Sequence, residues 1–99
     1  MKYEIPLKVE GDNVGIHLRP ACMIANVLQD TKEKFGVDMA LYDQGKRYEG
    51  GMQILTMGKL RGQTVDVRAE GERGKEALDY FLKRTEKIFV RNGDCREIE

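Results

Sequence analysis

A long helical repeat is the feature that most limits how this chain can fold. Over residues 18–34, apolar side chains recur at the spacing of one helix face, which can pack against a sheet. The members of this stripe are Ala21, Ile24, Ala25 and Leu28. Pro20 suits the first turn of the helix, because its missing N–H would lack an intrahelical partner there. Gly36 marks the end of the helix.

Shorter stretches around this helix alternate between apolar and polar residues, as half-buried strands do. They cover residues 2–9, 37–41, a short stretch near 47–48, and 63–69. Pro6 cannot donate a ladder hydrogen bond, so we expect the first strand to lie at a sheet edge. Two further helices are expected, a short one over 52–57 and a last one over 73–90. This order predicts an α+β fold, in which helices cover one face of an open sheet.

Composition narrows the class of protein. The chain has 99 residues, enough for one small domain, which we expect to span residues 1–90, with a polar and frayed C-terminal tail at 91–99. Its 17 basic and 17 acidic side chains cancel, which argues against nucleic acid as a partner. No apolar run is long enough for membrane insertion, and the N-terminus lacks the apolar block of a signal peptide. We therefore expect a cytoplasmic protein.

The reactive side chains are few. Cys22 lies in the helical repeat and Cys95 in the polar tail, so we expect no disulfide framework. One histidine and two distant cysteines offer no metal site, and no cofactor is expected. The absence of serine excludes a serine nucleophile. A thiol enzyme based on Cys22 would lack an assembled base.

The only histidine, His17, comes directly before the long helix, after a loop expected at residues 11–13. Free N–H groups and the positive end of the helix dipole favour a bound anion there, phosphate above all, and Arg19 adds a cation. The residues alone leave two interpretations open: a phosphate site, or a surface histidine that merely starts a helix.

The stretch Gly15-Ile16-His17-Leu18-Arg19-Pro20-Ala21 closely resembles the active-site signature of HPr, the histidine-containing phosphocarrier family of the bacterial phosphotransferase system. The order of elements is also similar from residue 1 to about residue 90. Weaker similarities lie at residues 44–46, 56–58 and 69–72. The resemblance implies an HPr-like open-faced β-sandwich of type βαββαβα. Its sheet would have four antiparallel strands in the order 1-4-2-3, with three helices on one face.

The resemblance also implies a function. His17 would accept a phosphoryl group from an enzyme I-like donor, ultimately from phosphoenolpyruvate, and pass it to an enzyme IIA-like or regulatory acceptor in sugar transport or its regulation. The backbone amides of Leu18 and Arg19 would bind the phosphate, and the Arg19 side chain would stabilise its charge. Such a monomeric phosphohistidine carrier is a transfer intermediate and not a classical turnover enzyme.

The sequence departs from the family pattern in its second helix and partner surface. The place of the family's regulatory serine falls at Gly50, or at one of the next two residues, so no regulatory serine is present. Asn26 and Gln29 stand where basic residues would be expected. These departures support an alternative, an HPr-like regulatory module that binds proteins without carrier turnover. The partner surface in either case would comprise Leu18, Cys22, Met23, Met52 and Leu55.

Overall fold

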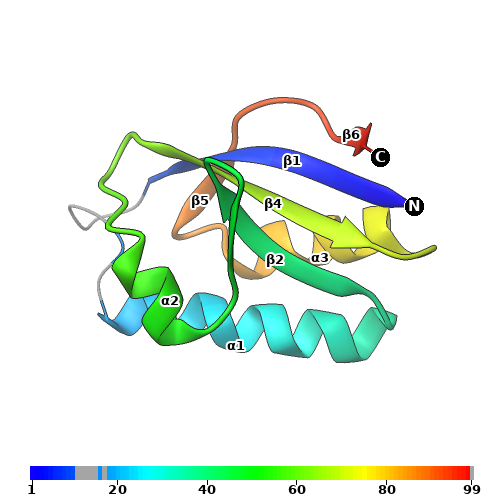
Figure 1. The fold of residues 1–99 in the computed structure, drawn as a ribbon, viewed down its shortest axis with the longest axis horizontal. Helices are drawn as coiled ribbons and strands as arrows, with labels where there is room; N and C mark the ends of the chain where they lie inside the picture. Colours follow the sequence, from blue (N-terminus) through cyan, green and yellow to red (C-terminus); the bar gives the residue numbers. More distant parts are fainter. Residues whose placement is uncertain (11–15, 17, 99) are drawn as a thin grey trace.

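The computed structural model describes residues 1–10, 16 and 18–98. Three helices and six strands follow one another along the described chain (Figure 1). They are β1 (Lys2–Val9), α1 (Leu18–Phe35), β2 (Asp38–Asp43), β3 (Lys46–Tyr48), α2 (Gly51–Thr56), β4 (Thr64–Glu70), α3 (Gly74–Arg84), β5 (Phe89–Arg91) and β6 (Arg96–Ile98). The loop predicted at residues 11–13 lies outside the described residues.

The strands form one antiparallel sheet with the helices on one of its faces (Figure 1). Hydrogen-bonded neighbours follow the path β3-β2-β4-β1-β5, and β6 also pairs with β1. In the longest pairing, Ile5 lies opposite Val67 and Leu7 opposite Val65, and all four side chains are buried. The fold class is therefore as predicted, an open-faced sandwich of antiparallel strands and three helices.

The sheet is not the predicted four-stranded sheet of order 1-4-2-3, because the C-terminal segment adds two strands beyond β1. Within the larger sheet, β1, β4, β2 and β3 remain neighbours in that order. β5 pairs with Leu7–Val9 and β6 pairs with Lys2–Glu4, so β1 is not an edge strand. Pro6 lies between these two paired stretches. Its carbonyl accepts a hydrogen bond of 2.8 Å from the N–H of Asn92. A gap between two short strands thus tolerates a proline that a continuous ladder would exclude.

The last helix is shorter than predicted, and the described chain beyond it pairs with the sheet through β5 and β6 instead of fraying. The buried hydroxyl of Thr85 donates 2.8 Å to the carbonyl of Phe81, and the chain then turns. The amides of Ile88 and Phe89 both donate 2.9 Å to the carbonyl of Thr85. Phe89 therefore starts β5 instead of ending a helix, while its side chain stays in the core at 2% exposure.

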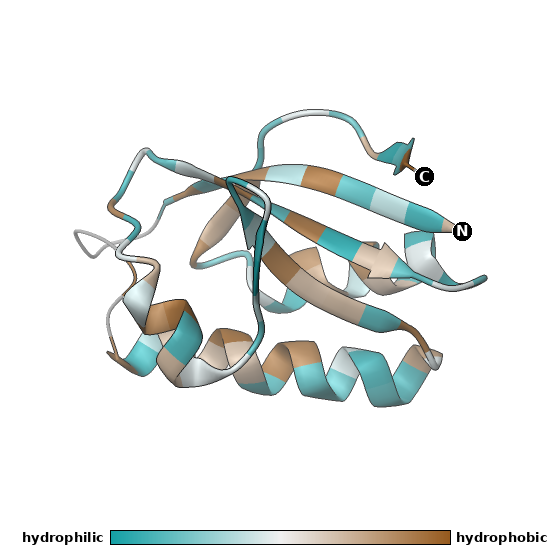
Figure 2. Cartoon of the chain, viewed as in Figure 1, coloured by the Kyte–Doolittle hydropathy of each residue, from teal (hydrophilic) through white to brown (hydrophobic). Residues whose placement is uncertain are grey.

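The first helix is confirmed, and its buried face is broader than the predicted stripe. Val27 and Thr31 are buried beside Ile24 and Leu28, and the Thr31 hydroxyl donates 2.6 Å to the carbonyl of Val27. Hydrophobic and hydrophilic stretches recur along α1 in Figure 2, as is typical of a helix that packs on one side. In the part of the chain that the structure describes, no helix is long and apolar enough to cross a membrane.

Candidate functional site

His17 and Gly15 lie outside the described residues, so the site is built from the residues that flank them. Ile16 is buried at 6% exposure, and its N–H donates 2.9 Å to the carbonyl of Lys59. Leu18 begins α1, and Pro20 falls in the first turn as predicted. The histidine thus stands in sequence between an anchored residue and a helix start.

The start of α1 has the electrostatic character of an anion site. The first N–H groups of a helix have no intrahelical partner, and those of Leu18 and Arg19 belong to this set. Both side chains are exposed, so solvent and partners can reach this turn. Within α1, the first turn contains no acidic residue that would compensate the positive end of the dipole. The turn is therefore suited to a dianionic group on the residue before it.

The start of α2 packs against the first turns of α1 (Figure 1). A Cβ atom added at Gly51 would lie 3.6 Å from the Sγ of Cys22 and 3.7 Å from its Cα. The side-chain oxygen of Gln53 accepts hydrogen bonds of 3.2 Å from the amides of Glu49 and Gly50 and so caps the short helix. The start of α2 is thereby placed beside Cys22, one of the predicted surface residues of α1.

Most of the predicted partner surface is exposed. Leu18 is 59% exposed, Met23 39% and Met52 70%, and Cys22 is also exposed. Leu55 differs, since it is half-buried and packs against the core. Leu60, which the sequence pattern does not single out, is also 57% exposed in the loop after α2.

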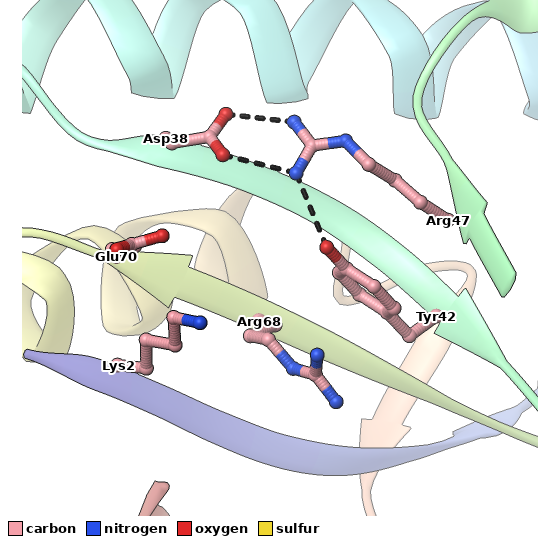
Figure 3. Close-up of a pocket in the computed structure, with 6 residues that line it drawn as sticks. All are labelled: Lys2, Asp38, Tyr42, Arg47, Arg68 and Glu70. Atoms are coloured by element: carbon pink, nitrogen blue, oxygen red, sulfur yellow. Dashed lines mark hydrogen bonds and ion pairs between the residues drawn. The ribbon is translucent and has the colours of Figure 1, made fainter. Parts of the chain in front are cut away.

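A pocket on the open face of the sheet lies away from this site (Figure 3). Its lining residues are Lys2, Asp38, Tyr42, Arg47, Arg68 and Glu70, none of them predicted as site residues. Arg47 binds Asp38 at 2.7 Å, and this hydrogen bond holds the pKa of Asp38 below its ordinary value. Arg68 stacks on the ring of Tyr42 at 3.9 Å. Within the pocket, Arg47 and Asp38 thus compensate each other, while Arg68 also donates a hydrogen bond of 2.8 Å to Glu4.

No cluster of metal-ligating side chains occurs among the residues that the structure describes. The start of α1 combines free backbone amides with the guanidinium of Arg19, and His17 precedes it directly in the sequence. An open-faced sandwich with an anion-favouring helix start defines the structural class of this small α+β domain.

Comparisons with known proteins agree with this class. A family model described as "PTS HPr component phosphorylation site" matches residues 7–86. The chain is 29% identical over 82 residues to the phosphocarrier protein HPr of Vibrio cholerae, covering 81% of this chain and 91% of the relative. It also resembles the crystal structure of HPr-C-His from Thermoanaerobacter tengcongensis, with a TM-score of 0.65 and 25% identity, covering 84% of this chain and 90% of that one.

The chain belongs to the PTS-HPr family, as the match to most of its length shows. β5 and β6 lie beyond the matched residues, so the two strands that complete the sheet are outside the part on which the family match rests.

Proposed function

We propose that this protein is a phosphocarrier that takes a phosphoryl group on His17 from an enzyme I-like donor and passes it to an enzyme IIA-like or regulatory protein. The observation that carries the proposal is the exposed, uncompensated start of α1, with Arg19 in its first turn and the histidine directly before it. Membership of the PTS-HPr family supports it. The carrier would act as a monomer in the cytoplasm.

The chemistry needs a nucleophile that is neutral near pH 7, and an imidazole with an ordinary pKa of about 6.5 meets this need. In the transfer, a bond forms between an imidazole nitrogen of His17 and phosphorus, while the bond from phosphorus to the donor breaks. In the family the modified nitrogen is Nδ1. The attacking nitrogen carries no proton, so the phosphorylated ring is at first cationic. It becomes neutral when the other ring nitrogen releases its proton to solvent. No water takes part, so the phosphoryl group remains available for the next acceptor.

The start of α1 would stabilise the charge on the transferred group. The amides of Leu18 and Arg19 can donate to phosphate oxygens, and the helix dipole adds to the attraction. The Arg19 guanidinium can donate charge-assisted hydrogen bonds as negative charge spreads over the equatorial oxygens. Because Arg19 is exposed, it can follow the group from donor to carrier. A shallow, exposed site also suits a carrier, which must release what it binds.

A regulatory binding module is the second candidate, and one observation favours it. Leu18, Met23 and Met52 expose apolar surface near the helix start, as docking sites do. Asn26 and Gln29 are exposed on α1 where the family pattern leads one to expect basic residues, so partner choice would differ from that of a sugar-transport carrier. The two candidate functions differ in whether His17 is repeatedly phosphorylated and dephosphorylated.

A phosphorylation assay distinguishes the two candidate functions. The protein is incubated with phosphoenolpyruvate and enzyme I from the same cell, and its intact mass is then measured. The carrier gains one phosphoryl group, which is acid-labile because it is a phosphoramidate. His17→Ala, in folded protein, gains none. Persistent lack of phosphorylation of the folded wild-type protein by its cognate donor would overturn the carrier function and leave the binding module.

A further inference from the structure

The loop of residues 59–63 is bonded to both ends of the segment that leads to His17. At the near end, the amide of Val9 donates 2.8 Å to the carbonyl of Gln63, and the amide of Gly62 donates 2.8 Å to the carbonyl of Val9. At the far end, the amide of Ile16 donates 2.9 Å to the carbonyl of Lys59. One short loop therefore bonds to the chain both before and after residues 11–15.

The loop is itself braced from within. The side-chain oxygen of Gln63 accepts 2.7 Å from the amide of Leu60, and the amide of Gln63 donates 3.0 Å to the carbonyl of Leu60. Gly62 adopts a φ of 90°, a left-handed conformation that favours glycine. These features fix the curvature of the loop, but none of them ties its first residue, Lys59, to the rest of the fold.

An ion pair provides that tie. The Nζ of Lys59 lies 3.0 Å from a carboxylate oxygen of Asp43, at the end of β2, and the two side chains are only 14% and 19% exposed. Exposed pairs contribute little to stability, and salt screens them, but a shielded pair is screened much less. Lys59, whose carbonyl accepts the hydrogen bond from the Ile16 amide, is thus held to the end of β2 through its side chain.

We propose that Asp43 and Lys59 are positioning residues for phosphoryl transfer: their ion pair fixes the Lys59 carbonyl, the carbonyl fixes Ile16, and Ile16 sets the place of the residue that follows it. The inference rests on the proposed function of His17. Neither side chain contacts the reacting group in this scheme. Its basis is the chain of contacts from Asp43 through Lys59 to Ile16.

Amide hydrogen exchange tests the anchoring without reference to phosphorylation. In Asp43→Asn and in Lys59→Met, the amide of Ile16 should exchange roughly fivefold to tenfold faster, the range expected when one net hydrogen bond is weakened. The amide of Val67 in the core of β4 should be unchanged, which separates local release from global unfolding. Lys59→Arg keeps the cation and should keep the protection of Ile16.

Transfer kinetics test the consequence for His17. With enzyme I as donor, Asp43→Asn and Lys59→Met should lower kcat several-fold with little change in KM, while Lys59→Arg restores kcat. Asp30→Asn is the matched control, because it weakens an exposed pair between α1 and Arg84 of α3 that does not involve the loop of residues 59–63. Its exchange at Ile16 and its transfer rate should match the wild type.

Unchanged exchange at Ile16 in both pair-breaking variants would overturn the anchoring. Faster exchange with a wild-type kcat would overturn the positioning role. Failure of the wild-type protein to take a phosphoryl group would instead refute the proposed function, and with it the catalytic consequence, whereas the exchange result would still decide whether the ion pair holds Ile16.

Discussion

Glu4 in β1 and Arg96 in β6 form an ion pair across 92 positions of the sequence. The other carboxylate oxygen of Glu4 accepts a hydrogen bond of 2.8 Å from Arg68 in β4. Glu4 is buried, at 5% exposure, although it lies on the polar face of the sheet. A buried carboxylate needs partners, so this ion pair adds to the three residue pairs that hold β6 against β1.

Replacement of Arg96 by glutamine should therefore destabilise the fold. One oxygen of Glu4 would lose its partner, and an unsatisfied buried acceptor costs about 1–3 kcal/mol. Urea denaturation monitored by circular dichroism measures the change in the free energy of unfolding. Glu97→Gln, at an exposed position next to Arg96, is the control and should leave that free energy within about 0.5 kcal/mol of wild type. Equal losses in the two variants would contradict the role of the pair.

Arg19→Ala should slow phosphoryl transfer far more than it destabilises the domain. Loss of a hydrogen bond to a charged group is worth about 1.5–3 kcal/mol, which corresponds to a rate loss of about 10- to 150-fold. Rapid-quench measurement of phosphoryl uptake from enzyme I gives the rate, and thermal unfolding checks the fold. Lys83→Ala removes an exposed cation on α3 and should transfer at the wild-type rate. Equal rates for Arg19→Ala and wild type would remove Arg19 from the chemistry.

Met52→Asp should weaken partner binding without harming the fold. The Met52 side chain is 70% exposed, so a polar replacement costs the folded state little, whereas a buried charge in an apolar interface is unfavourable. The KM for the carrier in the enzyme I reaction should rise about tenfold or more, the effect of losing 1.4 kcal/mol of binding. Lys83→Asp introduces the same acid on a remote helix and serves as control. A KM shift of equal size in both variants would speak against a docking role for Met52.

Asp66 and Asp38 should respond to pH in opposite directions. Burial, followed by the negative charge of Glu4, raises the pKa of Asp66, whereas the hydrogen bond from Arg47 lowers the pKa of Asp38. A raised carboxyl pKa destabilises the fold above that pKa, and the penalty vanishes as the pH falls below the value in the unfolded chain. A lowered one stabilises the fold above the unfolded value, and the gain is lost as the pH falls through the folded value.

Asp66→Asn should consequently raise the unfolding temperature at pH 7, and Asp38→Asn should lower it. Both differences from wild type should shrink as the pH approaches 3, where the carboxylates of the unfolded chain are largely protonated. Differential scanning calorimetry at pH 3, 5 and 7 follows the trend. A lower unfolding temperature for Asp66→Asn at pH 7 would contradict the assigned cost of burying that charge.

Local patterns made much of the fold predictable. The helix at Leu18–Phe35 follows from a long periodic repeat. The β2–β3 turn follows from Gly45, whose φ of 81° favours glycine, although Gln44 before it also has a positive φ of 52°. The short helix α2 and the strand β4 were also placed within a residue or so by glycines at their ends. In each case the information lies within a few neighbouring residues.

The errors arose where distant residues decide the structure. Arg96–Ile98 is too short to show alternation, and its pairing with Lys2–Glu4 joins the two ends of the chain. Ile88 and Phe89 continue the apolar spacing of a helix, but the hydroxyl of Thr85 bonds to the carbonyl one turn back at the point where the helix ends. Periodicity alone cannot distinguish a helix that continues from a strand that begins.

The residues of the candidate site also divide into those that local sequence predicts and those that depend on distant contacts. His17, Arg19 and Pro20 stand in one short motif, so their association could be predicted from sequence. Lys59 could not be found this way, because it contributes a backbone carbonyl to Ile16 and an ammonium group to Asp43, and both partners are distant in the chain.

The placement of β1 inside the sheet also affects how copies of this protein meet. An unpaired β1 would present an edge of eight residues to any other chain. Instead, the outermost strands of the sheet are β3, β5 and β6, each only three residues long. Such short edges are poor templates for further strand pairing. The C-terminal segment thus covers the edge of β1. We expect a chain truncated after α3 to be less stable and to self-associate through that edge.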